Sequence, residues 1–176
     1  MEYVNRCVKL CLPSGQVVDI LQPVLSAMGN WLQTTPSLPE SCGFLIGYMN
    51  RITKNITISN LTTPKEQDIR TRFSCRLQDR NHFRALAKSR KEANYYMGVW
   101  HTHPQEAPSP SNIDWCDWYD TLRQDRTGSQ YVFFVIAGIT EFRVWAGEIA
   151  TGKICEIFEA EMLDGIYLKG DSSNEN

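Results

Sequence analysis

Histidine is scarce in this sequence, with three residues among 176, so the position of each one is informative. An excess of basic charge is also missing, since 18 Lys and Arg residues are set against 20 Asp and Glu residues, for a formal net charge of −2. Proteins that bind nucleic acid need a dense basic stripe to neutralise phosphates. The most basic stretch, Arg80–Lys91, is typical of one face of a solvated helix. The composition therefore argues against a nucleic-acid partner.

Long hydrophobic runs are absent as well. The longest apolar stretch, Tyr131–Ile139, has the length of a buried strand and is far too short to span a membrane. The chain opens without the basic start of a secretory signal peptide. We therefore expect no membrane association and a cytoplasmic location in a bacterial cell. We expect a single domain over residues 1–169, and a disordered polar tail over residues 170–176.

Paired C-x-x-C spacing is missing from the six cysteines, which argues against a zinc ribbon. In a reducing compartment, the simplest interpretation of such residues is small buried hydrophobic side chains with free thiols. The six residues are Cys7, Cys11, Cys42, Cys75, Cys116 and Cys155.

Apolar residues recur with helical spacing in three stretches and with strand spacing in nine others. Helices are expected over residues 22–33, 79–94 and 112–124. Strands are expected over residues 4–12, 16–20, 42–49, 55–61, 71–77, 95–101, 131–136, 141–146 and 153–159. On the second helix, Phe83, Leu86 and Ala87 are expected to face inward and His82 to be exposed. This order predicts an α+β fold, with a curved, mostly mixed β-sheet flanked by about three helices.

Two of the three histidines lie one residue apart, in the sequence W-H-T-H-P at the end of an apolar run. Alternate side chains of a strand share one face, so His101 and His103 point the same way and offer two ligands for a zinc ion. Asp114 follows in the first turn of the third expected helix and can supply a third ligand. Three protein ligands leave one tetrahedral position for water, as in catalytic zinc sites. The alternative is that the two histidines are strand residues with no metal between them.

Two further polar residues can complete such a site. Ser111 lies three residues before Asp114, and Ser-x-x-Asp also fits a helix capping box. The two roles are compatible, because Ser111 can cap the helix and still face the site. A metal-activated water needs a base, and Glu40 is the candidate, although a glutamate before a strand is ordinarily a surface residue.

Together, Glu40, His101-x-His103 and, after seven residues, Ser111-x-x-Asp114 resemble the signature of the JAB/MPN (JAMM) metalloproteases. The flanking sequences P-E-S-C-G-F-L-I-G and P-S-P-S-N-I-D are similar too, and the resemblance covers roughly residues 38–146. It implies the JAB/MPN fold, which is cytidine-deaminase-like. It also implies one Zn²⁺ per chain, bound by His101, His103 and Asp114 together with a catalytic water. Glu40 would be the general base and Ser111 would stabilise the oxyanion.

The resemblance also implies a substrate class, because the family cleaves peptide or isopeptide bonds after the C-terminal tails of ubiquitin-like proteins. The stretch from Trp100 to Trp118 is similar to the stand-alone JAB proteases of bacterial antiphage (CBASS) operons. Those proteases release a cGAS-like nucleotidyltransferase from proteins to which its C-terminus has been conjugated, and such a conjugate is the expected partner. One alternative is a JAB protease of another ubiquitin-like or sulfur-carrier pathway. Another is a non-catalytic MPN scaffold, against which the complete motif argues.

Three tryptophans cluster around the motif in the sequence. Trp100, Trp115 and Trp118 are candidates for lining a groove that accepts an extended substrate tail by strand addition. The alternative is that they pack the helix over residues 112–124 against the sheet.

Overall fold

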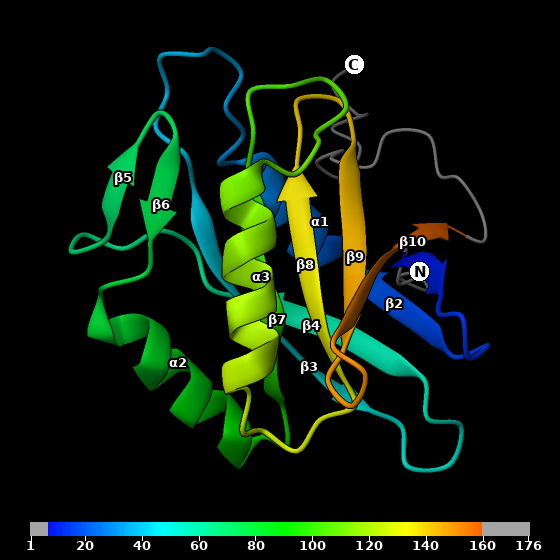
Figure 1. The fold of residues 1–176 in the computed structure, drawn as a ribbon. Helices are drawn as coiled ribbons and strands as arrows, with labels where there is room; N and C mark the ends of the chain where they lie inside the picture. Colours follow the sequence, from blue (N-terminus) through cyan, green and yellow to red (C-terminus); the bar gives the residue numbers. More distant parts are fainter. Residues whose placement is uncertain (1–6, 160–176) are drawn as a thin grey trace, which may run out of the picture.

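The computed structural model describes residues 7–159 and contains ten strands and three helices in that range (Figure 1). Residues 1–6, the expected domain end at residue 169 and the expected tail over 170–176 lie outside the described residues. The strands are β1 (Cys7–Cys11), β2 (Val17–Leu21), β3 (Cys42–Met49), β4 (Ile56–Leu61), β5 (Ile69–Thr71), β6 (Ser74–Arg76), β7 (Tyr95–Thr102), β8 (Tyr131–Ala137), β9 (Phe142–Glu148) and β10 (Lys153–Glu159). The helices are α1 (Gln22–Gly29), α2 (Arg80–Lys91) and α3 (Asn112–Gln124).

Eight strands form a closed barrel in the order β1-β10-β9-β8-β7-β3-β4-β2, whereas β5 and β6 form a separate hairpin. Two neighbouring pairs are parallel, β2 with β4 and β7 with β8, and the others are antiparallel. The mixed sheet and the three helices are confirmed, but the curved sheet is corrected to a closed barrel. Leu10 pairs with Glu159 and Cys11 with Phe158, so the first and last strands meet. Closure gives partners to edge groups that would otherwise be unpaired.

The central strand β8 is buried along its whole length because it contributes to two apolar layers. Phe133 and Val135 belong to the cluster that fills the barrel. Phe134 and Ile136, on the opposite face, belong to the layer that Trp118 of α3 covers. A strand that is covered on both faces consists almost entirely of apolar residues, which accounts for the apolar stretch Tyr131–Ile139 in the sequence.

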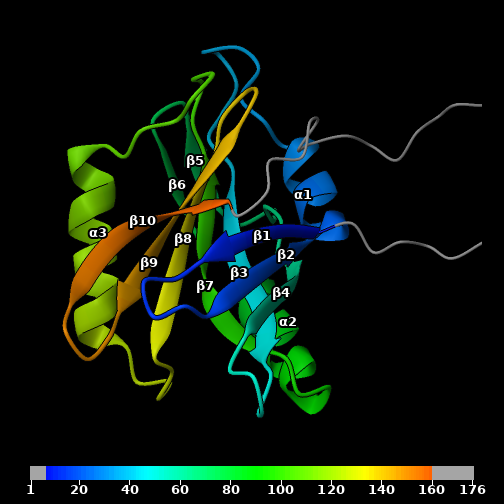
Figure 2. The ribbon, with the colours of Figure 1, turned by 90° about the vertical axis from the view of Figure 1, so that its right-hand side faces the viewer.

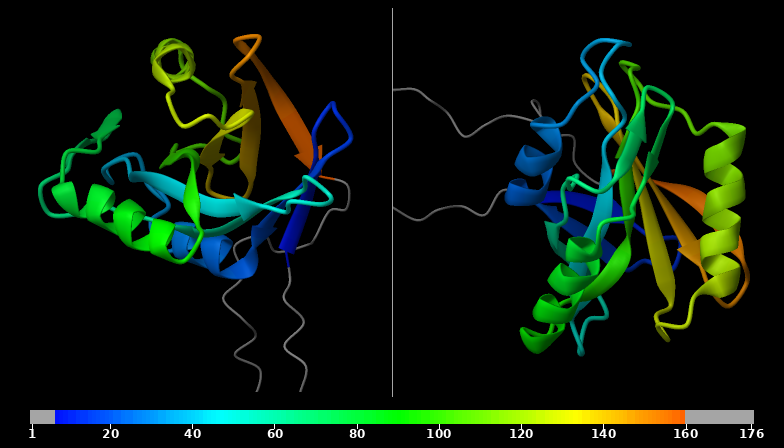
Figure 3. Two further views of the ribbon diagram at one scale, coloured as in Figure 1. Left: turned by 90° about the horizontal axis from the view of Figure 1, so that it is seen from below. Right: turned by 90° about the vertical axis from the view of Figure 1, so that its left-hand side faces the viewer.

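The helices cover different sides of the barrel. Figures 2 and 3 show α3 on one side, with α1 and α2 on the other. Within the described residues, no helix is both long enough and apolar enough to cross a lipid bilayer.

Close packing around β3 requires glycine at residue 43, because a Cβ atom there would lie 1.8 Å from Thr62 O and 2.6 Å from Trp100 Nε1.

The expected orientation of α2 is wrong for His82, Phe83 and Ala87, whereas Leu86 is half-buried. His82 is fully buried, whereas Phe83 is 56% exposed and Ala87 is also exposed. The imidazole of His82 is 2.7 Å from Thr62 Oγ1 through Nδ1 and 2.7 Å from Asp68 Oδ2 through Nε2. These two polar partners, distant in sequence, satisfy both ring nitrogens and allow the histidine to turn inward.

The expectation of six free thiols is also wrong, because Cys42 in β3 and Cys75 in β6 form a disulfide with their Cα atoms 5.9 Å apart. The β5–β6 hairpin folds back onto the chain just before β3, where Glu40 N–H donates to Thr71 O at 2.7 Å. This return brings the two cysteines together across 33 positions of sequence. The remaining four cysteines, Cys7, Cys11, Cys116 and Cys155, are free.

Candidate metal centre

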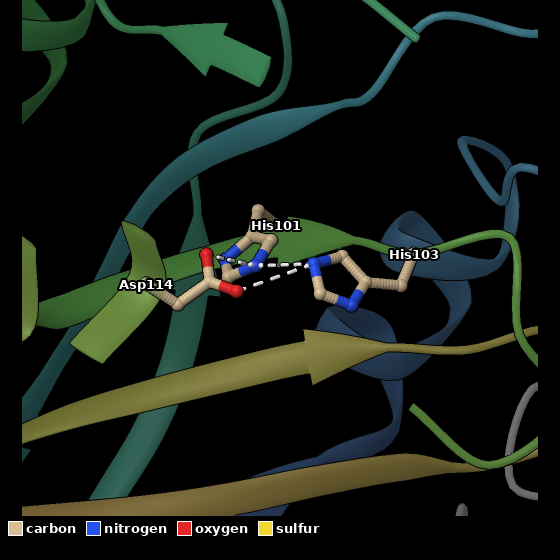
Figure 4. Close-up of side chains that lie close together, drawn as sticks. All are labelled: His101, His103 and Asp114. Carbon is tan, nitrogen blue, oxygen red and sulfur yellow. Dashed lines mark hydrogen bonds and ion pairs between the residues drawn. The ribbon is translucent and has the colours of Figure 1, made fainter. Parts of the chain in front are cut away.

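Three side chains from two elements converge at one end of the barrel: His101 in β7, His103 just after it, and Asp114 in the first turn of α3 (Figure 4). β7 pairs in parallel with β8 as far as Ala137, and His103 N–H then donates to Ala137 O at 3.1 Å. The extended conformation therefore continues past the last residue of β7. Both imidazoles consequently point to the same side, as the alternation of side chains predicts.

The facing atoms of the three side chains lie close together. His101 Nε2 is 3.2 Å from His103 Nε2 and 3.1 Å from Asp114 Oδ1. His103 Nε2 is 3.4 Å from Asp114 Oδ2, and all the candidate ligand atoms lie within 4.8 Å of one another. Two imidazoles and a carboxylate are a donor set that could hold a metal ion. The side chains are only 10–15% exposed, so the cluster is shielded from solvent on most sides.

The charges within the cluster favour an ionised carboxylate. Burial alone would raise the pKa of Asp114, but hydrogen bonds from His101 and His103 outweigh it and hold the pKa well below its usual value. For His103, burial lowers the pKa, and the bond to Asp114 more than offsets this, so the net direction is upward. The ionised Asp114 therefore supplies a negative charge that stabilises a cation placed against it.

The start of α3 fixes the direction of the Asp114 carboxylate. Ser111 is the N-cap, and the capping box expected from Ser-x-x-Asp is confirmed. Asp114 Oδ2 accepts hydrogen bonds from Ser111 N at 2.6 Å and from Ser111 Oγ at 2.7 Å, and Asp114 N–H donates to Ser111 Oγ at 3.1 Å. The same bonds that begin the helix thus aim the carboxylate at the two histidines.

Glu40 lies just before β3 and is 8% exposed, unlike an ordinary glutamate at a strand start. The backbone places it near the cluster, because Cys42, two residues further along the chain, pairs with His101 in the β3–β7 ladder. Burial raises the pKa of the Glu40 carboxyl, the imidazoles of His101 and His103 act in the opposite direction, and Asp114 adds to the increase. The four ionisable groups therefore form one electrostatically coupled site.

Gln105 is a site residue that the sequence analysis missed. Its Oε1 atom accepts a hydrogen bond from Ser109 N at 3.0 Å and lies 3.3 Å from His103 Nδ1. An atom that accepts from a backbone N–H is an oxygen, so His103 Nδ1 must be the donor, and in the neutral imidazole the lone pair that a metal requires is then on Nε2. A glutamine two residues after a histidine carries no sequence signal for this role.

The turn between β8 and β9 is hydrogen-bonded to the loop that carries Gln105. Ile139 N–H donates to Gln105 O at 2.7 Å, and Glu141 N–H donates to Glu106 O at 3.3 Å. Gly138 is required there, because a Cβ atom would lie 2.7 Å from Gln105 O and from Glu106 O. The backbone carrying the His103 partner is therefore held against β8 and β9.

The tryptophans have different environments. Trp100 is fully buried, and its Nε1 donates to Thr62 O at 2.9 Å. Trp118 is 3% exposed and stacks on Phe134 at 4.8 Å between ring centroids. Trp115 is partly exposed and lies edge-on to Trp118. The packing alternative therefore accounts for Trp118, whereas Trp100 belongs to the cluster that fills the barrel, and Trp115 remains the candidate with surface to offer a substrate.

The sequence matches the family described as prokaryotic homologs of the JAB domain over residues 21–147, a range that includes every residue of the site. A protein from Escherichia coli (strain TW11681) named "CD-NTase/cGAS isopeptidase" is 31% identical over 104 residues, covering 57% of this chain and 65% of that protein. This chain thus aligns with just under two thirds of that relative's length. A protein of the same name from Vibrio cholerae (serotype O1, El Tor Inaba N16961) is 29% identical over 140 residues, covering 77% of this chain and 83% of that protein.

The fold has a solved counterpart in the solution structure of a protein from Desulfitobacterium hafniense. The TM-score is 0.51 at 16% sequence identity, with 82% of this chain and 90% of that chain covered, so the likeness concerns the fold alone. The resemblance inferred from the motifs is confirmed by the family match and by the names of the relatives. This chain belongs to the family of prokaryotic homologs of the JAB domain.

Proposed function

We propose that this protein is a zinc-dependent isopeptidase of bacterial antiphage defence. Its substrate would be a conjugate in which the extended C-terminal tail of a cGAS-like nucleotidyltransferase, or of a ubiquitin-like protein, is joined to an amine of another protein. The observation that carries this proposal is the convergence of His101, His103 and Asp114 beside the buried Glu40. The names of the two relatives support the substrate class.

The cluster fits a zinc ion. Tetrahedral ligands about 2.0–2.1 Å from zinc lie about 3.3–3.4 Å from one another. The separations between the facing atoms, 3.2, 3.1 and 3.4 Å, are close to that value. When bound, zinc lowers the pKa of a coordinated water to about 7 and polarises the scissile carbonyl.

The protein's own groups then have distinct tasks. The Glu40 carboxylate accepts a proton from the attacking water and returns it to the leaving amine, a transfer that its raised pKa favours. The Ser111 hydroxyl has one proton, which it now donates to Asp114 Oδ2. If that hydroxyl turns to the developing oxyanion, Ser111 N–H still holds the Asp114 carboxylate in place.

A cleavage assay tests this function. The tail of a nucleotidyltransferase from the same operon would be fused in front of a reporter, and the masses of the products would be followed. We expect cleavage directly after the tail, loss of cleavage with a zinc chelator, and recovery when zinc is returned. Cleavage that survives the chelator would exclude the metal mechanism. Cleavage of a sulfur-carrier tail, but not of this one, would move the protein to the alternative pathway.

Gln105 should set the zinc affinity through His103. Replacing Gln105 by methionine removes the acceptor at His103 Nδ1 with little change in volume. We expect the dissociation constant for zinc to rise about 10–100-fold, because partners of this kind fix the tautomer and orientation of a ligating histidine. Competition with a chromogenic chelator would measure it, with Gln124→Met, at the exposed end of α3, as the control. Equal affinity for both variants would contradict the role of Gln105.

A further inference from the structure

A second set of polar side chains lies behind the candidate metal centre and is buried more deeply than the centre itself. Thr102, between the two histidines, is fully buried, and Gln33 is 1% exposed. Because side chains alternate along an extended chain, Thr102 points to the face opposite His101 and His103. Neither residue belongs to the JAB signature, and neither can act on a substrate from the interior.

Thr102 joins the strand of the histidines to the segment of Glu40. Its Oγ1 atom accepts a hydrogen bond from Ser41 N at 2.9 Å and donates to Gln33 Oε1 at 3.0 Å. Its backbone N–H donates to Ser41 O at 3.0 Å. Ser41, the residue next to Glu40, is therefore held through both its N–H and its C=O by a residue that separates two of the candidate ligands.

Gln33 extends this connection to the segment on the other side of Glu40. Its Nε2 atom donates to Leu38 O at 3.0 Å and to Arg72 O at 3.2 Å. The hairpin that carries Arg72 also holds the Glu40 backbone, because Arg70 Nε donates to Glu40 O at 2.7 Å. A single buried carboxamide thus ties β7, the loop before β3 and the β5–β6 hairpin to one another.

We propose that Thr102 and Gln33 are positioning residues that set where the Glu40 carboxylate lies relative to the zinc ligands. This inference rests on the proposed function and deepens it. A general base must lie within about 2.6–3.2 Å of the atom whose proton it takes. A shift of about 1 Å can lower the rate about 100-fold. Two hydrogen bonds join Ser41, next to the base, to Thr102, between the ligands, and the Thr102 hydroxyl makes one of them, so it contributes directly to this distance.

The test compares Thr102→Val, which removes the hydroxyl at nearly constant volume, with Thr102→Ser, which retains it. For Thr102→Val we expect kcat to fall about 10–100-fold with KM and zinc content unchanged. Thr102→Ser should restore most of kcat. Gln33→Met should resemble Thr102→Val, and the two changes together should cost little more than one, because they break the same connection.

A matched control separates positioning from stability. Thr62 is also buried, and its Oγ1 accepts from Phe44 N at 2.8 Å, further along β3. Thr62→Val should lower the melting temperature about as much as Thr102→Val and leave kcat per folded molecule unchanged. Equal kcat losses in both variants would overturn the proposal.

Hydrogen exchange in the metal-free protein gives a readout that does not depend on activity. Thr102→Val should speed exchange of the Ser41 amide about tenfold or more, because that amide loses its acceptor, whereas Thr62→Val should not. Unchanged Ser41 exchange, or faster exchange with unchanged kcat, would overturn the positioning role. A wild-type protein that cleaves no reporter would instead refute the proposed function, and Ser41 exchange would still decide whether Thr102 holds this segment.

Discussion

Replacing Glu40 by glutamine is expected to lower kcat by about 10²–10⁴-fold and to leave a folded, zinc-loaded protein. Glutamine has nearly the same shape but cannot accept the proton of the attacking water. Glu40 is absent from the group of side chains whose ligand atoms converge on a metal position, so zinc content should remain that of the wild type. The measurement is kcat on the tail fusion together with zinc content by mass spectrometry.

The stability of Glu40→Gln provides a second, independent test of the role of Glu40. Burial raises the pKa of Glu40, so the ionised form is less stable in the folded protein than in the unfolded chain. The folded protein therefore loses stability as pH rises from the unfolded pKa through the folded one. Glutamine carries no charge, and we expect the free energy of unfolding at pH 7 to be equal to or higher than that of the wild type. A residue kept for stability would give the opposite result.

The control for Glu40→Gln is Glu66→Gln, at an exposed position in the loop before β5. It should leave kcat, zinc content and stability unchanged. Loss of zinc from Glu40→Gln would place this residue among the ligands, and retention of kcat would remove it as the base. Glu40→Ala should agree with Glu40→Gln in zinc content and in loss of activity, since the missing carboxylate is common to both.

Features set by neighbouring residues could be predicted from the sequence. The bounds of β3, α3 and β10 agree with expectation. For α3, the reason is local, because Ser111 and Asp114 form the capping box within one turn. The common direction of the His101 and His103 side chains also depends only on the local chain, since side chains alternate along an extended strand.

Features that depend on distant partners could not be predicted in the same way. His82 is buried because Thr62 and Asp68 receive its imidazole, and the apolar pattern of α2 contains no trace of them. Closure of the barrel depends on the meeting of β1 and β10, at opposite ends of the described chain. The β5–β6 hairpin, from a distant part of the sequence, is hydrogen-bonded to the Glu40 backbone, and no residue next to Glu40 in the sequence indicated that this glutamate is buried.

The disulfide belongs to this second group, and its removal is expected to lower the free energy of unfolding by about 3–4 kcal/mol. A crosslink restricts the unfolded chain, and the effect grows with the logarithm of the loop that it closes. The sequence separation of 33 between Cys42 and Cys75 places the expected loss in that range. Cys75→Ser is the suitable variant, because Cys75 is half-buried, whereas Cys42 is 5% exposed and a hydroxyl there would lose its contact with water.

Urea denaturation would measure the loss, with Cys155→Ser as the control, because Cys155 is an exposed free cysteine. The control should change the free energy of unfolding by less than about 0.5 kcal/mol. A dithiol reductant should bring the wild type down to the stability of Cys75→Ser and leave that variant unchanged. Equal denaturation midpoints for the oxidised wild type and Cys75→Ser would show that the crosslink does not stabilise the fold.

Cys75→Ser should mainly lower stability, whereas Thr102→Val should mainly lower kcat. Without the disulfide, the hairpin is still joined to Glu40 by the hydrogen bond to Thr71 O and by Arg70, and to Gln33 through Arg72 O. Below the unfolding transition these bonds keep the Glu40 segment in place, so Cys75→Ser should lose much stability and little kcat. Thr102→Val should lose less stability and much more kcat, because it removes the bond from Ser41 N–H to the Thr102 hydroxyl and holds the segment less firmly to the strand that carries the histidines. If Cys75→Ser lost as much kcat as Thr102→Val, the crosslink itself would be the element that positions Glu40.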